Sequence, residues 1–183
     1  MRRISLTLAA LAAVVVTSPA AAQTPVWTTD IVKDITQAEE KFVALAKAFT
    51  HENAMWRPAE GIRSSQEVLL HVAADNYFIP AAMGIPAPAA TKITATDFNA
   101  VAAFEKQPLD QAATVAAIEA SFDHIRTALT GISEARLNEK IKVFGQEFTV
   151  RQFVVLAATH MHEHLGQLIA YSRMNGVKPP WSR

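Results

Sequence analysis

The chain has 183 residues, of which 50% are hydrophobic and 19% are charged, and it contains no cysteine. This composition is typical of one globular domain with its own core and is too apolar for a disordered chain. Seventeen basic residues balance seventeen acidic ones, so no excess of positive charge indicates a nucleic acid partner. The lack of cysteine excludes disulfides, thiolate metal ligands and a cysteine nucleophile.

Residues 1–22 have the pattern of a secretory signal peptide. Arg2 and Arg3 supply positive charge, residues 4–16 are almost wholly apolar, and three alanines before Gln23 form a small-residue cleavage site. The apolar run is shorter than the roughly 20 residues that a membrane-spanning helix needs. We therefore expect a mature protein of residues 23–183, a single domain without a membrane span, that is periplasmic or secreted.

Hydrophobic periodicity predicts two long helices in the first half of the mature chain. Apolar residues recur at every third or fourth position over residues 30–49, which indicates an amphipathic helix. A loop is expected at residues 53–63. The segment from Ser64 to Glu67 then matches a capping box, so a second helix should begin there and end near residue 83, before a glycine and a proline.

The second half of the chain predicts two more long helices. Residues 84–110 are rich in proline, alanine and threonine and read as a long connection, with a short helical piece at 97–105. An amphipathic helix follows at 109–130. A small hairpin is expected at 141–148, before a last helix at 150–175. Four long amphipathic helices predict an all-α fold, a four-helix bundle with a long connection between its second and third helices.

Three of the six histidines lie close together in the last predicted helix. His160 and His164 are four residues apart and share one face of a helix, whereas His162 points nearly the opposite way. The first pair also falls on the apolar seam of the helix, so both imidazoles should face the interior. Two core histidines satisfied by polar neighbours would fit this pattern, but two inward imidazoles at ligand spacing favour a metal site.

The second predicted helix supplies a third histidine for such a site. Its inward-facing residues are expected to include His71, with Asp75 one turn away. Asp75 is interpreted as a fourth ligand, as an outer acceptor that orients a ligand, or as a carboxylate at the boundary with solvent. His124 lies off the apolar stripe of the third helix and is expected at the surface or the boundary.

Five motifs follow one another along the chain. They are Trp56-x-Pro58, Arg63-Ser64, His71, His160-x-x-x-His164-x-Gly166-Gln167 and Tyr171-x-Arg173-x-Asn175-Gly176-x-x-Pro179-Pro180. Taken in this order, they resemble the motifs of the DinB-like superfamily, and of an exported subgroup within it. The resemblance implies a four-helix bundle, often a homodimer, whose three core histidines bind a divalent transition metal. Zinc is the commonest ion implied, and Ni²⁺, Mn²⁺ and Fe²⁺ are also implied. Members that act as thiol transferases commonly have arginine where this chain has Leu165, so the resemblance carries over the site and not the reaction.

A competing motif is His160-x-x-Glu163-His164, the inverted zinc-protease pattern. That pattern needs a further carboxylate ligand downstream, and no Asp or Glu follows His164. The sequence therefore favours a metal-dependent hydrolase or transferase of a small-molecule substrate, with Gln167 or Asp75 orienting the ligands. The alternative is a non-enzymatic, metal-stabilised binding protein that contacts a partner through the loops around Trp56 and Trp181.

Overall fold

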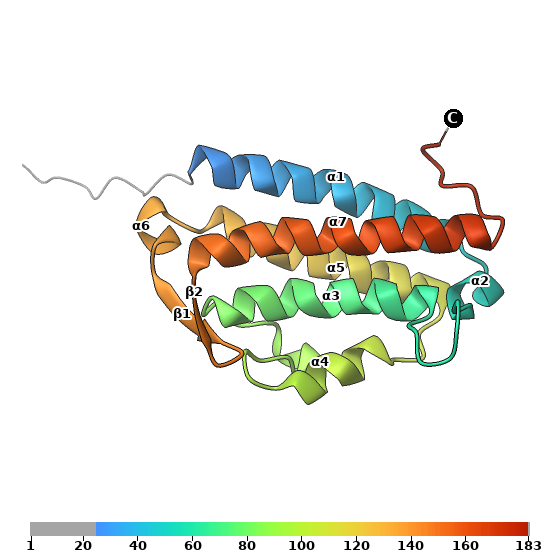
Figure 1. Ribbon diagram of the computed structural model, residues 1–183, viewed down its shortest axis with the longest axis horizontal. Coiled ribbons are helices and arrows are strands. Elements are labelled where there is room, and N and C mark those ends of the chain that lie inside the picture. Colours follow the sequence, from blue (N-terminus) through green and yellow to red (C-terminus); the bar gives the residue numbers. More distant parts are fainter. Residues whose placement is uncertain (1–24, 183) are drawn as a thin grey trace, which may run out of the picture.

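The computed structural model of the protein describes residues 25–182 and contains a four-helix bundle, which confirms the predicted fold (Figure 1). The long helices are α1 (Val26–Ala48), α3 (Ser65–Ala82), α5 (Gln111–Thr130) and α7 (Val150–Met174). None of the described helices is long and apolar enough to cross a membrane. The expected signal peptide at residues 1–22 lies outside the described residues.

Shorter elements connect the four helices. They are α2 (His51–Met55), the 3₁₀ helix η1 (Ala89–Thr91), α4 (Phe98–Glu105), α6 (Glu134–Leu137), and the antiparallel strands β1 (Lys140–Val143) and β2 (Gln146–Thr149). The helical piece and the hairpin are as predicted, but α2 was not predicted. A capping box between Thr50 and Asn53 begins α2. The connection between α3 and α5 carries α4 along the outside of the bundle, packed on α3 (Figure 1).

Reciprocal capping boxes begin two of the long helices. At α3 the side chain of Ser64 accepts from the backbone N–H of Glu67, and the Glu67 carboxylate accepts from the Ser64 N–H at 2.7 Å. Thr149 and Gln152 form the same arrangement at the start of α7, directly after β2. These caps satisfy backbone donors that have no partner inside the helix. They therefore fix the first residue of each helix that carries a candidate ligand.

Helix α3 is the most enclosed element of the bundle, because α5, α7 and α4 all pack against it. Thirteen of its 18 residues are buried, so the prediction of a single inward stripe on this helix is wrong. Glu67, His71 and Asp75 are among the few residues that are only partly buried, and they are spaced by four. They therefore form one strip along α3, and this strip is the less covered side of the helix, not its most buried face.

Candidate metal centre

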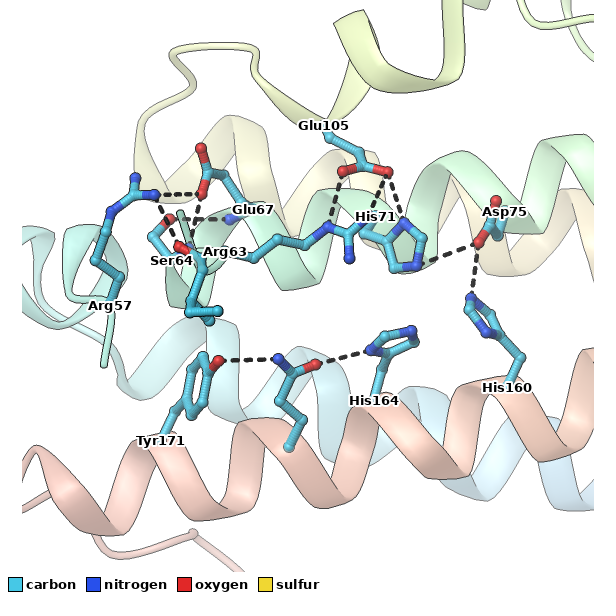
Figure 2. A network of polar contacts seen from close by, with 12 residues as sticks. Arg57, Arg63, Ser64, Glu67, His71, Asp75, Glu105, His160, His164 and Tyr171 are labelled. Atoms are coloured by element: carbon cyan, nitrogen blue, oxygen red, sulfur yellow. Dashed lines mark hydrogen bonds and ion pairs between the residues drawn. The ribbon is translucent and has the colours of Figure 1, made fainter. Parts of the chain in front are cut away.

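The structure brings together the three predicted histidines, one from α3 and two from α7. Candidate ligand atoms of His71, His160 and His164 all lie within 4.8 Å of one another. Figure 2 shows the ring of His71 facing the two rings of α7, with ring centroids 5.1 Å from His160 and 4.6 Å from His164. His162 points away from them and lies 2.8 Å from the Asp34 carboxylate of α1. Helix geometry therefore places His160 and His164, but not His162, beside His71.

Two of the three rings are held in orientation by a hydrogen bond between one ring nitrogen and an oxygen acceptor. Nδ1 of His71 lies 2.6 Å from Oε1 of Glu105, and Nδ1 of His164 lies 2.8 Å from Oε1 of Gln167. Because an ionised carboxylate and an amide oxygen only accept, Nδ1 of each ring carries the proton. The lone pair of each ring is then on Nε2. Gln167 is fixed in turn, since its amide N–H donates to the Tyr171 hydroxyl at 2.9 Å.

The third ring lies against Asp75. Nε2 of His160 is 2.7 Å from Oδ2 of Asp75, but the two are not aligned as a hydrogen bond, and Nε2 is buried without a hydrogen-bond partner among residues 25–182. The same carboxylate oxygen is 3.4 Å from Nε2 of His71 (Figure 2). Asp75 thus faces the histidines with a side chain only 16% exposed. This position disfavours the solvent-facing interpretation of Asp75 and leaves the two ligand-related ones.

Local electrostatics keep the cluster suited to binding a cation. Burial lowers the pKa of His164, and the neighbouring His160 and His71 lower it further, although Gln167 acts in the opposite direction. The neutral imidazole that a metal requires is therefore favoured. Burial acts to raise the pKa of Glu105, but hydrogen bonds from His71 and Arg63 outweigh it, and the net effect is a lowered pKa. Glu105 is ionised and is a strong acceptor for the His71 N–H.

Glu105 is a residue of the site that the sequence did not reveal. It is the last residue of α4, the short helical piece that was predicted inside the connection at residues 84–110. Its Oε1 lies next to His71, and its Oε2 accepts from Nε of Arg63 at 2.9 Å. The only sequence signal was a glutamate at the end of the predicted helical piece. Its partner His71 is 34 residues away in the sequence, and only the packing of α4 on α3 brings them together.

A cavity of about 650 Å³ lies beside the histidine cluster. Its lining includes Arg57, Arg63, Glu67, Glu105, Lys106 and Gln167. Two of these residues, Glu105 and Gln167, are the groups that hold ring nitrogens of the cluster, so the cavity lies next to the residues that contact the histidines. Trp56 does not line this cavity and packs edge-on against Tyr171 with ring centroids 5.3 Å apart.

The fold and the site together define a four-helix bundle with a three-histidine cluster between two of its helices. Residues 34–168 match the family model of the DinB superfamily, which spans well over half of the chain. The protein therefore belongs to the DinB superfamily, as its motifs indicated. No curated protein is significantly similar to the chain in sequence.

Solved structures of this family share the fold at low sequence identity. A DinB-like protein of Bacillus subtilis, YjoA, is 20% identical with a TM-score of 0.63, covering 83% of this chain and 96% of its own. A DinB-like protein of Bacillus cereus is 16% identical with a TM-score of 0.68, covering 85% and 97%. YfiT of Bacillus subtilis, described as a probable metal-dependent hydrolase with an unusual four-helix bundle topology, is 12% identical with a TM-score of 0.64, covering 88% and 95%.

Proposed function

We propose that this protein is a metal-dependent hydrolase or transferase of a small molecule, with His71, His160 and His164 holding a divalent transition metal. The observation that carries the proposal is the convergence of three imidazoles whose candidate ligand atoms lie within 4.8 Å of one another. The description of YfiT as a probable metal-dependent hydrolase supports it from a protein of the same fold.

The residues present fit a metal ion. Nε2 of His160 is buried without a hydrogen-bond partner among the described residues, a state that costs free energy unless another group binds that nitrogen. The other two rings direct Nδ1 protons to acceptors and keep Nε2 available. Three neutral imidazoles beside a carboxylate suit Zn²⁺ first and Ni²⁺, Mn²⁺ or Fe²⁺ as well.

A metal held there would supply Lewis acidity, which polarises a substrate oxygen and makes a water molecule easier to deprotonate. The remaining roles belong to the side chains. Glu105 and Gln167 set the tautomer and the orientation of two ligand rings. Asp75 is a second carboxylate beside the cluster, with Oδ2 2.7 Å from Nε2 of His160, and is placed to accept a proton from a reacting group. A substrate bound in the cavity beside the cluster would contact Glu105 and Gln167, the residues that orient two of the rings.

The position of Asp75 also favours a second candidate function. Its Oδ2 lies close to two of the three rings, so Asp75 is positioned to complete a set of four protein ligands. Structural metal sites are closed in this way, whereas catalytic sites keep one position open. In that case the protein would be a metal-stabilised binding protein without enzymatic activity.

Metal content tests the first part of the proposal. Elemental analysis of protein purified without a His-tag or added metal should find close to one equivalent of a transition metal. The double variant His160→Ala, His164→Ala should lose it, while His162→Ala, a matched change on the outer face of the same helix, should keep it. No metal in the unaltered protein, even after soaking, would end the proposal.

Cobalt substitution separates the enzyme from the binding protein. An open position lets a small anion such as azide reach the ion, so azide should change the visible absorption spectrum of the Co²⁺ protein. A spectrum that azide does not alter would favour the closed, structural site. For such a structural site, removal of the metal with a chelator should lower the free energy of unfolding without the loss of any catalytic activity.

We further propose that residues 1–22 direct export, which leaves residues 23–183 as a periplasmic or secreted protein that forms a homodimer. The export proposal is supported by the charged, apolar and small-residue segments of the N-terminus, and the dimer proposal by the family resemblance. Intact-mass measurement of the secreted or periplasmic product should give a chain that begins at Gln23. Light scattering should give twice the mass of that chain.

A further inference from the structure

We infer that the cavity beside the histidine cluster binds a small molecule through a carboxylate or phosphate group, with Lys106 and Arg57 as the residues that recognise the oxyanion. This inference rests on the proposed function, because it names the substrate class of the same site. It adds a recognition element that lies at the C-cap of α4 and on the loop before α3, apart from the candidate metal ligands.

The charged groups that line the cavity carry an excess of positive charge. Three of them are cationic, Arg57, Arg63 and Lys106, and two are acidic, Glu67 and Glu105. The acidic groups are already engaged. Glu67 accepts from the Ser64 N–H at 2.7 Å and lies 3.1 Å from Arg57. Glu105 lies against His71 and Arg63, as described above (Figure 2). Neither carboxylate is therefore free to neutralise a further cation.

The cationic groups keep donors that none of the described residues uses. Lys106 is exposed and makes no ion pair within residues 25–182. The guanidinium of Arg57 uses Nη1 for the Ile62 carbonyl and for Glu67, and its side chain remains 39% exposed. Arg63 uses Nε and Nη2 for Glu105. Charge-assisted donors on residues that line a cavity match an oxyanion, and a planar guanidinium matches a carboxylate or a phosphate.

The dimensions of the cavity are those of a small-molecule site. Its volume of about 650 Å³ lies within the range of roughly 300–1,000 Å³ typical of ligand pockets. Glu105 and Gln167 are shared between the cavity and the cluster, so a molecule anchored by its anionic end at Lys106 would extend toward the histidines. The competing explanation is structural, because Lys106 is the C-cap of α4, where a cation stabilises the helix dipole.

Titration by ¹H–¹⁵N NMR tests the inference. The probes are benzoate, phenylphosphonate and benzamide, which share a ring and differ in charge. Measurements are made on metal-free and zinc-loaded protein at mildly alkaline pH, where histidines are neutral. Lys106→Gln, alone and with Arg57→Gln, is compared with Lys142→Gln, the same change on an exposed lysine of β1, an element at the opposite end of the bundle from α2 (Figure 1).

One of the two anions should bind to both protein forms at least about tenfold more tightly than benzamide, since the neutral probe lacks the charge-assisted contacts. Lys106→Gln should weaken that binding about three- to fivefold at low ionic strength, the double variant should weaken it more, and Lys142→Gln should leave it unchanged. Whether benzoate or phenylphosphonate binds more tightly identifies the carboxylate or the phosphate as the natural group.

Three results would overturn the inference. The first is equal binding of benzamide and the anions. The second is anion binding that requires zinc and is insensitive to Lys106→Gln, because the metal itself would then be the anion site and the proposed function would stand. The third is a loss of stability in Lys106→Gln without a change in anion binding, which supports the helix-capping explanation. If instead the protein binds no metal but binds an anion in a Lys106-dependent way, the metal proposal fails and the anion site remains.

Discussion

Replacing Glu105 with glutamine should weaken metal binding without removing any metal ligand. The carboxylate accepts from Nδ1 of His71 at 2.6 Å, and its side chain is only 12% exposed. Hydrogen bonds to charged groups contribute about 1.5–3 kcal/mol. Glutamine keeps the shape but loses the charge, so most of this contribution to the basicity and orientation of His71 should be lost. Loss of the hydrogen-bond partner of a metal-bound histidine typically lowers metal affinity by about 10–100-fold, which corresponds to about 1.4–2.8 kcal/mol. This range agrees with the contribution expected for the hydrogen bond itself.

Competition with a chromophoric chelator measures the zinc affinity of the unaltered protein, Glu105→Gln and a control. The control is Glu119→Gln, which removes an exposed carboxylate of α5 that lies 3.2 Å from Lys47 and should leave the affinity unchanged. Urea unfolding of the metal-free proteins checks that Glu105→Gln remains folded. An affinity of Glu105→Gln within about twofold of the unaltered protein, far short of the usual effect of such a change, would refute the assignment of Glu105 as the residue that positions His71.

Two further predictions concern the fold. Phe122→Ala should lower the free energy of unfolding by about 3–5 kcal/mol, because Phe122 is fully buried with its ring 5.7 Å from that of Phe42; Phe144→Ala, at a 62% exposed position, should cost much less in the same urea titration. Burial lowers the pKa of His124 from its ordinary 6.5. Between the folded-state pKa and pH 6.5, His124 therefore binds a proton in the unfolded chain but not in the folded protein. The unfolding free energy of the metal-free protein should therefore fall as the pH drops from 6.5 to the folded-state pKa, and an undiminished slope in His124→Asn would contradict this cause.

Local signals in the sequence were sufficient for the long helices. The capping box at Ser64 gave the start of α3, because side chain and backbone partners three residues apart need no tertiary context. Boundaries at other ends shifted by a few residues, as at α1, which begins at Val26. The short helix α2 was missed. The burial of α3 on nearly all sides was also missed, since the number of elements that pack on a helix is not encoded in its own periodicity.

The candidate site was also predictable from the sequence only in part. His160 and His164 were identifiable from sequence alone, because a spacing of four within one helix fixes their common direction, and that spacing also separated them from His162. The inward-facing residues expected for the second helix added His71, and the family motifs include it. Only the tertiary structure placed Glu105 on His71, aimed Asp75 at the cluster rather than at solvent, and assembled Lys106 and Arg57 around one cavity. These groups come from separate elements. The distances between them depend on how α4, and the loop that precedes α3, pack against α3.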